Sequence, residues 1–299
     1  MLPTFFIVNP KSGNGNVTRT IPLIRQLFNE ARIPFEIYLT KRANDATAVA
    51  REMSGKFPIL VSVGGDGTVN EVVNGMGSSN ILGVLPTGSG NDFSKMLHLP
   101  RGISDILQVI AGQKTKRIDL GHIIAVNSKS EKIEKYFANS VGIGLDARVA
   151  YEARKFPMLR GLAKYIVASM KSIFSYKAAM AQVTFGSRVS LGKHLLIAIG
   201  NGKSAGGGFY LTPDAIIDDG LLDVCLAKDI SVMETLKIFP FVLKGKHGRF
   251  DKIEFGRAAS LTVRGDDDLP VHVDGEVIGL DNREIVIDLK PRALEVIVP

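Results

Sequence analysis

The chain has one cysteine, no tryptophan and no long apolar run, and these shortages exclude several classes of protein. Because Cys225 is the single cysteine among 299 residues, no internal disulfide can form, which is typical of a reducing compartment. No apolar run reaches the roughly 18 residues that a transmembrane helix requires. The N-terminus also lacks the basic region of a signal peptide. We therefore expect a cytoplasmic protein.

Acidic residues are also in short supply, since 37 lysines and arginines outnumber 30 aspartates and glutamates and leave a net charge of +7. This excess indicates an acidic partner, such as an anionic membrane, a phosphorylated ligand or a nucleic acid. Because the basic residues are scattered and no nucleic-acid-binding motif is present, we expect no nucleic acid. The five histidines lack the spacing of a metal site and no Ser-His-Asp arrangement can be argued, which excludes zinc enzymes and serine hydrolases.

The pattern of strands and helices divides the chain into two parts. Up to about residue 120, strand and helix patterns alternate, which predicts a parallel α/β sheet with strands at 4–8, 35–40, 58–63 and 80–86. Beyond it, short β-rich runs dominate and are interrupted by helical insertions near 157–179 and 231–244. The expected fold class is α/β plus all-β, with an α/β nucleotide-binding domain at 1–120 and a C-terminal β-sandwich domain at 121–299.

Three glycine-rich turns follow predicted strands of the α/β part: NPKSGNG (9–15), GGDG (64–67) and PTGSGNDF (86–93). Because the carboxyl ends of parallel strands meet at one edge of a sheet, we expect these turns to form one cleft. Glycines let backbone amides approach a ligand closely, and a helix N-terminus favours phosphate. Asp66 would repel a bare anion, so the expected ligand is a magnesium-bound polyphosphate or a neighbouring sugar hydroxyl.

Two stretches of the C-terminal part contain carboxylates that are candidates for a functional role. Asp219 could bind Mg²⁺ together with neighbouring carbonyls, or it could belong to a plain Asp-Gly turn. Asp274 and Glu276 flank a glycine, and Asp-Gly is itself a hairpin signal. The functional interpretation makes one of these two carboxylates a general base toward a hydroxyl and the other its orienter. Spacing alone favours the plain turn at Asp219, and the hairpin signal is strong at Asp274–Gly275 as well.

Taken in order, NPKSG, GGDGTVNEVVNG, LPTGSGNDF, GNGKSAGGG, DDGLLDV and DGE resemble the diacylglycerol kinase catalytic family. The likeness is to its soluble bacterial lipid kinases, relatives of sphingosine and ceramide kinases, and it runs from about Phe5 to Val298. It implies an N-terminal domain like that of NAD kinases and phosphofructokinases, with ATP in the cleft beside the β-sandwich. It also implies transfer of the γ-phosphate of ATP to a lipid hydroxyl with Mg²⁺.

The resemblance assigns roles to residues that match the family motifs. Its ATP contacts are Asn9, Pro10, Lys11, Ser12, Gly13, Thr40, Gly64, Gly65, Asp66, Gly67, Thr68, Val69, Asn70 and Thr87. Its magnesium site is Asp219 with the carbonyls of Ile216 and Leu221, and its proton acceptor is Glu276, with Asp274 as a second candidate. The lipid stays open among diacylglycerol, phosphatidylglycerol, a monoacylglycerol and a sphingoid base, and so does the question of a homodimer.

Two other functions compete with this one. An NAD kinase shares the Gly-Gly-Asp turn, but PTGSGNDF and DGE belong to the lipid branch of the resemblance. A catalytically silent lipid-binding module would have no need of Asp274 and Glu276.

A basic, amphipathic segment at 155–179 indicates how the protein reaches a lipid. One helical face carries apolar residues, and we expect it to pack on the β-domain: Leu159, Leu162, Ala163, Ile166, Val167, Met170, Ile173 and Phe174. Basic residues surround that face or lie in a second segment: Arg154, Lys155, Arg160, Lys164, Lys171 and Lys177, then Lys244, Lys246, Arg249 and Lys252. We expect peripheral, salt-sensitive binding to anionic membranes, weakened by Lys164→Glu and Lys171→Glu without loss of fold.

Overall fold

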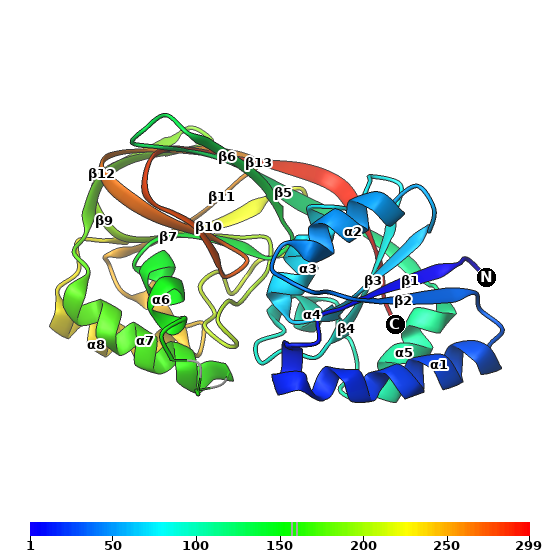
Figure 1. The fold of residues 1–299 in the computed structure, drawn as a ribbon. Helices are drawn as coiled ribbons and strands as arrows, with labels where there is room; N and C mark the ends of the chain where they lie inside the picture. The colour runs from blue at the N-terminus through cyan, green and yellow to red at the C-terminus, as the bar shows by residue number, and fades with distance from the viewer. Residues whose placement is uncertain (157, 160) are drawn as a thin grey trace. The chain divides into compact units, whose positions relative to one another are not determined.

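The computed structural model of the protein describes residues 1–156, 158–159 and 161–299, and it contains two compact units (Figure 1). Unit 1 comprises Met1–Ile118 and Arg292–Pro299, and unit 2 comprises Asp119–Pro291. The division falls close to the expected boundary at residue 120. However, Arg292–Pro299 belong to unit 1, which corrects the expected second range of 121–299. They do so because the end of the last strand, β13 (Glu276–Ile297), pairs in parallel with β4 (Ile81–Pro86).

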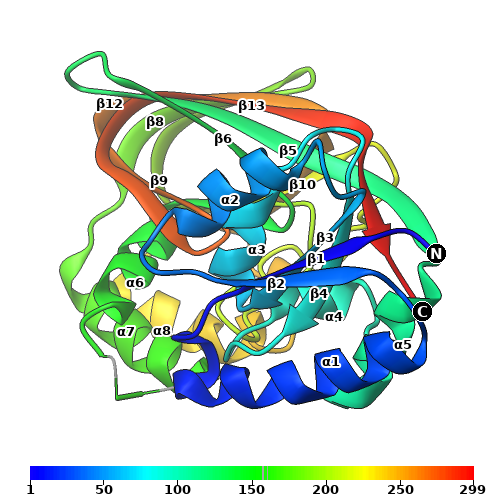
Figure 2. The same cartoon turned by 45° about the vertical axis from the view of Figure 1, so that its right-hand side comes forward.

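Unit 1 is built on a parallel sheet in the order β2, β1, β3, β4 and the end of β13. Its first three strands are β1 (Thr4–Val8), β2 (Phe35–Leu39) and β3 (Ile59–Gly64), which together with β4 confirms the four predicted strands. The connecting helices are η1 (Ser12–Arg19), α1 (Thr20–Glu30), α2 (Asp45–Met53), α3 (Asp66–Val73), α4 (Asp92–Met96) and α5 (Ile103–Gly112). Helices α1 and α5 cover one face of the sheet, and α2 and α3 cover the other (Figures 1 and 2).

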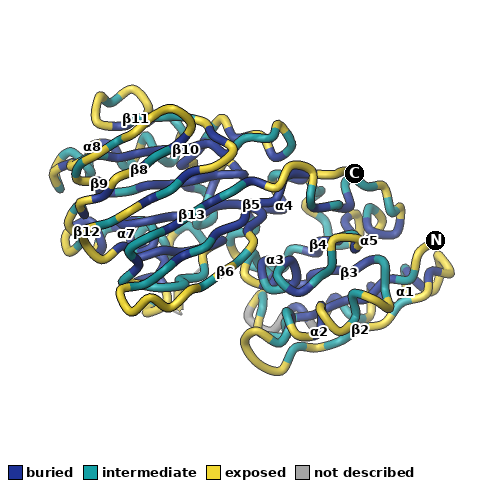
Figure 3. Tube along the Cα trace, turned by 90° about the horizontal axis from the view of Figure 1, so that it is seen from above, coloured by how far each residue is buried: buried dark blue, intermediate teal, exposed yellow. Residues whose placement is uncertain are grey.

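Helices on both faces explain why β1 and β3 are predominantly apolar and do not alternate with polar residues. Every residue of these two strands is buried, whereas the edge strand β2 is only partly buried (Figure 3). Phe6, Phe28 and Phe35 meet edge to face in the layer between the sheet and α1. This aromatic layer packs α1 against the sheet, and the predicted ligand-binding turns follow the carboxyl ends of β1, β3 and β4.

Unit 2 is dominated by antiparallel strands: β5 (Thr115–Asn127), β6 (Lys132–Phe137), β7 (Ser140–Gly144), β8 (Ala179–Phe185), β9 (Arg188–Gly200), β10 (Leu222–Lys228), β11 (Ile253–Ala258) and β12 (Ser260–Val273). The long strands β9 and β12 each pair with β8 along one half and with β7 along the other. Strand β12 changes register between Arg264 and Leu269, which lets it bend from one layer into the next. A continuous apolar core fills the space between the layers, as expected for a β-sandwich.

Three helices interrupt the strands of unit 2: α6 (Leu145–Ala153), α7 (Gly161–Ser175) and α8 (Val232–Val242), followed by the short η2 (His247–Arg249). The last two of the three match the expected insertions, whereas α6 was not expected. The run at 135–141 forms parts of β6 and β7, with a break at Ala138 and Asn139. Within the described ranges, no helix has the length and apolarity needed to cross a bilayer.

Candidate active site

The three glycine-rich turns of unit 1 lie together and hold one another by hydrogen bonds. The N–H of Thr87 donates to the carbonyl of Gly64 over 2.8 Å, and the Thr87 hydroxyl lies 2.9 Å from that of Ser12. The Asn9 carboxamide donates to Thr68 Oγ1 over 3.2 Å. The expected cluster at the carboxyl ends of β1, β3 and β4 is therefore present.

Several glycines of these turns are required by packing alone. A Cβ on Gly64 would lie 2.2 Å from Thr68 Oγ1, and one on Gly88 would lie 2.5 Å from the Cα of Gly65. Gly13 has φ +55°, and its Cβ would lie 2.8 Å from the Thr87 carbonyl oxygen. Since no side chain fits at these contacts, the fold alone accounts for these glycines.

Gly67 differs from its neighbours, because neither packing nor backbone conformation requires a glycine there. It is the second residue of α3 and is exposed, and no described neighbouring atom lies within 4 Å of where its Cβ would stand. Glycine near the start of a helix costs stability relative to alanine. Gly67 thus leaves the space beside the N-terminus of α3 open, and a helix N-terminus is a favourable place for a phosphate.

Asp66 opens helix α3 directly after Gly65, and its carboxylate links two of the turns. Its Oδ1 accepts a hydrogen bond from the N–H of Phe93 over 3.2 Å, at the start of α4. A carboxylate in the first turn of a helix is stabilised by the helix dipole. Asp66 therefore has a structural role within unit 1 as well as a place at the expected ligand end of the sheet.

The remaining predicted ATP contacts fall into two groups. Thr40 follows β2, where its N–H donates to the Val8 carbonyl over 2.8 Å, and Pro10 and Lys11 lie at the accessible rim of the first turn. Val69 and Asn70, by contrast, are buried in α3 with 3% and 1% exposure. Those two side chains face the fold, so a ligand could meet only their backbone.

In unit 2 the Asp-Gly turn, Asp274–Gly275, joins β12 to β13 as a two-residue hairpin loop. Val273 and Glu276 pair across it, and both turn residues have positive φ, +48° and +83°. This is the backbone of a type I′ turn, which a hairpin with Asp-Gly favours. The hairpin interpretation of this stretch is therefore confirmed as structure.

The two acids of the turn differ sharply in their surroundings. The Asp274 carboxylate is buried and accepts hydrogen bonds from three consecutive backbone N–H groups, those of Ala138, Asn139 and Ser140, over 2.8–3.1 Å. Glu276 is partly exposed, and its Oε2 lies 2.8 Å from Lys135 Nζ on β6. Asp274 is thus committed to the fold, whereas Glu276 remains accessible.

The predicted magnesium residues lie in the loop that precedes β10. The Asp219 carboxylate accepts a hydrogen bond from the Leu221 N–H over 3.1 Å and lies 3.2 Å from Arg257 Nη2. The Asp119 carboxylate accepts a hydrogen bond from the Gly220 N–H over 2.7 Å, and this bond holds the loop to β5. A carboxylate beside backbone carbonyls is the oxygen donor set that Mg²⁺ takes, so the chemistry fits, although a cation would share Asp219 with Arg257.

No side-chain cluster in the described chain completes such a site. Among the described residues, no three His, Cys, Asp or Glu side chains are grouped closely enough to hold a metal. A cation at Asp219 would therefore depend on carbonyls, including those of Ile216 and Leu221, and on water for its other ligands.

One lysine of the basic segment, Lys171 of α7, forms an ion pair with a buried carboxylate of α6. Glu152 of α6 has a side chain only 1% exposed and forms ion pairs with Arg148, Lys155 and Lys171 over 2.7–3.2 Å. Hydrogen bonds from Lys155 and then Lys171 lower the pKa of Glu152 to about 2. Since Lys171 helps to neutralise a buried carboxylate, the structure argues against the expectation that Lys171→Glu leaves the fold intact.

The apolar face of α7 is divided between the core and the surface. Ile166, Met170 and Ile173 pack with the apolar cluster of this side of unit 2, as expected. Val167 and Phe174 do not, with 39% and 69% exposure. Arg160, expected among the basic residues, lies outside the described residues.

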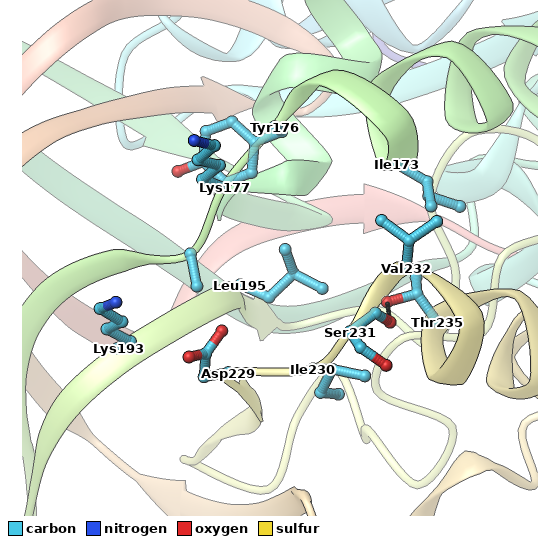
Figure 4. A pocket seen from close by; sticks show the side chains of 11 residues that line it. Ile173, Tyr176, Lys177, Lys193, Leu195, Asp229, Ile230, Ser231, Val232 and Thr235 are labelled. Atoms are coloured by element: carbon cyan, nitrogen blue, oxygen red, sulfur yellow. Dashed lines mark hydrogen bonds between the residues drawn. The ribbon is translucent and has the colours of Figure 1, made fainter.

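A cavity of about 250 Å³ lies elsewhere in unit 2, where α7 ends and α8 begins (Figure 4). Ile173, Leu195 and Ile230 form its apolar wall, and Lys177 and Lys193 lie among its polar residues. None of the predicted ATP, metal or proton-transfer residues lines it.

Several residues of these sites carry no sequence signal that we interpreted. Lys135, Asp119, Arg257 and His272 each contact a predicted residue or its turn, and Asp146 contacts His272. His272 lies close to Gly275 in the chain, whereas the other contacts join residues that are far apart in sequence. No fixed spacing could have identified those distant partners.

Comparison with known proteins covers almost the whole chain. Residues 3–123 match the family described as diacylglycerol kinase catalytic domain, and residues 139–298 match the YegS C-terminal NAD kinase beta sandwich-like domain. A diacylglycerol kinase of Staphylococcus saprophyticus is 31% identical over 91% of this chain and 88% of its own length. One of Staphylococcus aureus is 30% identical over 91% and 85%, respectively.

Solved structures give the same picture. The crystal structure of a putative diacylglycerol kinase from Bacillus anthracis has a TM-score of 0.80 and 25% identity, and the alignment covers 99% of this chain and 97% of that one. Yeast NADH kinase complexed with NADH has a TM-score of 0.53 at 12% identity, covering 100% of this chain and 84% of that one. At that identity, the second likeness shows the fold alone.

Proposed function

Because the chain belongs to the diacylglycerol kinase family of lipid kinases, we propose that it transfers the γ-phosphoryl group of ATP to the hydroxyl of a lipid, with Mg²⁺ as cofactor. The observation that carries the proposal is the cluster of three mutually bonded turns at one edge of the unit 1 sheet. Within this cluster, Gly67 leaves open space beside the N-terminus of α3, although the packing of the fold does not require a glycine at this position.

The nucleotide would be held chiefly by backbone amides of these turns. The expected contacts at Asn9–Gly13, Gly64–Asn70 and Thr87, with Thr40 beside them, follow strands that end at one edge of the sheet. Lys11 supplies an exposed positive charge at the rim. Bound Mg²⁺ would neutralise phosphate charge that Asp66 would otherwise repel.

Glu276 is the better candidate for the proton acceptor. Its carboxylate is accessible, whereas that of Asp274 is buried under three backbone N–H donors. In the proposed step the lipid hydroxyl oxygen bonds to the γ-phosphorus and the bond from the γ-phosphorus to the bridging oxygen of ADP breaks. The hydroxyl proton passes to Glu276. Asp274 would instead hold the turn that carries Glu276.

Diacylglycerol is the first acceptor to examine, because the named bacterial relatives are diacylglycerol kinases. The second candidate is a related lipid with a primary hydroxyl, such as phosphatidylglycerol. The competing function is that of an NAD kinase, and the likeness of the fold to yeast NADH kinase is the reason to test NAD as an acceptor as well.

The test is phosphoryl transfer from labelled ATP with Mg²⁺ to micelles of diacylglycerol, phosphatidylglycerol, monoacylglycerol or sphingosine, and to NAD in parallel. We expect a labelled phospholipid, and labelled NADP in its place would refute the lipid acceptor. Glu276→Gln should lower kcat by about 10²- to 10⁴-fold, the usual contribution of a general base, with the KM for ATP little changed. Wild-type kcat in Glu276→Gln would refute the assignment of the base.

For the metal, we propose that Mg²⁺ binds Asp219 and the carbonyls of Ile216 and Leu221, which also stabilises the loop before β10. Metal that binds only the native state raises its melting temperature. We therefore expect Mg²⁺ to raise the Tm of the wild type but not that of Asp219→Ala, measured without nucleotide. An equal response of the two proteins would argue against this site.

For access to the lipid, we propose peripheral binding to anionic membranes through the basic surface around α7, including Lys164, with the exposed Phe174 beside it. Each basic residue near an anionic surface contributes about 1 kcal/mol, an attraction that salt weakens. Lys164→Glu should weaken binding to vesicles containing phosphatidylglycerol. The matched control is Lys56→Glu, which reverses an exposed lysine on unit 1. Equal binding to neutral and anionic vesicles at low salt would refute the proposal.

A further inference from the structure

A buried histidine lies directly beneath the Asp-Gly turn of unit 2. His272 is 2% exposed, and its Nδ1 accepts a hydrogen bond from the N–H of Gly275 over 3.2 Å. Its Nε2 lies 2.8 Å from Oδ2 of Asp146, in the first turn of α6. Because a backbone N–H can only donate, Nδ1 must carry no proton, and the neutral ring therefore donates from Nε2 to the carboxylate.

The chain leaves room for this pair at Gly142. Gly142 faces His272 across the β7–β12 pairing, and a Cβ there would lie 2.2 Å from Asp146 Oδ2 and 2.3 Å from His272 Nε2. Even alanine would stand between the two groups. The glycine, the carboxylate and the imidazole therefore form a single packed arrangement.

The turn above this arrangement is held from two sides. On one side the Asp274 carboxylate and N–H bind residues 138–140, and on the other His272 binds the N–H of Gly275. Asp274 has φ +48°, the left-handed conformation that a type I′ turn requires and that Asp-Gly favours, and the hydrogen bonds on both sides fix where this turn lies. Glu276 is the next residue after the turn, so its position follows from the turn.

We infer that Asp146 and His272 are positioning residues: the hydrogen-bonded chain from Asp146 through His272 to the Gly275 N–H aims Glu276. The inference rests on the proposed role of Glu276 as proton acceptor. His272 exchanges no proton with substrate, since it is buried and both its ring nitrogens are occupied, and Asp146 acts through His272. Their effect is on geometry, and small displacements of a reacting group are costly.

Substitutions can break each bond of the chain separately. Asp146→Ala removes the acceptor for His272, whereas Asp146→Asn retains a side-chain oxygen there. We expect Asp146→Ala to lower kcat by about 10- to 100-fold, the scale of a misplacement near 1 Å, with the KM for ATP unchanged. Asp146→Asn should retain most of the wild-type kcat. His272→Gln, which keeps a donor toward Asp146 but no acceptor at Nδ1, should resemble Asp146→Ala.

A second readout does not depend on activity. In the folded wild type, the Gly275 amide should exchange slowly with solvent, and the ¹⁵N shifts of His272 should show a proton on Nε2 alone. Faster Gly275 exchange in His272→Gln and Asp146→Ala, at unchanged protection of the β12 amides, would show that the turn has loosened while the fold remains. This result would stand even if the chain phosphorylated none of the lipids above.

The matched control is the other histidine–carboxylate pair of unit 2, in which His122 Nε2 lies 2.8 Å from Glu134 Oε1 between β5 and β6. Glu134→Ala should leave kcat and Gly275 exchange unchanged. Wild-type kcat and wild-type Gly275 exchange in folded Asp146→Ala would overturn the inference. So would a change confined to the KM for lipid, because Asp146 would then contact the acceptor itself.

Discussion

Gly67→Ala separates the needs of the fold from those of the ligand. An alanine at this exposed helical position meets no described neighbour within 4 Å and requires no unusual φ. Alanine is favoured over glycine in a helix by up to about 1 kcal/mol, and part of that gain comes from a less flexible unfolded chain. For a chain of this size, 1 kcal/mol raises Tm by about 2–4 °C. We therefore expect a more stable protein.

The same methyl group should weaken nucleotide binding. If the phosphates of ATP approach the N-terminus of α3, the added Cβ occupies space that the ligand needs. An overpacked contact costs about 1–3 kcal/mol, which corresponds to a dissociation constant raised about 5- to 150-fold. Isothermal titration calorimetry with ATP and Mg²⁺ measures this, and differential scanning calorimetry measures the Tm.

Gly112→Ala is the matched control. Gly112 is the last residue of α5, is exposed, and likewise has no described neighbour within 4 Å of its Cβ position. It should show a similar gain in Tm with unchanged ATP affinity. If Gly67→Ala behaved like Gly112→Ala in both measurements, the reasoning that places a ligand at α3 would be refuted.

Three further perturbations test other features of the molecule. Asp66→Ala should abolish turnover and weaken Mg-ATP binding. Loss of its hydrogen bond to the Phe93 N–H and of its interaction with the helix dipole should also lower the free energy of unfolding by roughly 1 kcal/mol. Full ATP affinity in this variant would show that Asp66 serves only the fold. Because Lys155 foremost lowers the folded pKa of Glu152 to about 2, ionised Glu152 stabilises the fold above its ordinary pKa near 4.5, and this stability is lost as pH falls from there toward 2. Tm should therefore fall more steeply between pH 5 and 3 in the wild type than in Glu152→Gln, and parallel slopes would contradict the ion-pair role. Burial raises the pKa of the Cys225 thiol to about 12, so a thiol reagent at pH 8 should label the unfolded chain and leave the native protein unlabelled; rapid native labelling would contradict the burial.

Two lysines of the basic helical region, Lys164 and Lys171, show why a pattern of charges predicts structure less well than a pattern of apolar residues. The sequence shows Lys164 and Lys171 as equivalent members of one basic surface. The fold makes Lys171 a partner of the buried Glu152. A charge is free or committed according to what lies opposite it on another helix, and spacing along one helix does not contain that information.

The local elements of unit 1 and the place of its glycine-rich turns could be predicted from the sequence. Strands β1 to β4 were predicted because apolar runs and glycine-rich turns are local signals, and the rule that parallel strands end at one edge placed Asn9, Asp66 and Thr87 together. The Asp-Gly hairpin was predicted for the same reason, since a two-residue turn needs only its own residues.

Which acid of that hairpin is accessible, and which contacts hold the turn in place, depends on packing between elements that are far apart in the chain. Asp274 and Glu276 are two residues apart and chemically alike, yet one accepts three backbone N–H bonds from residues 138–140 and the other faces Lys135. Asp146 lies 126 positions from His272 in the chain. Hydrogen bonds across strands have no period along the chain, so the contacts that position Glu276 exist only once β7, α6 and β12 have packed together.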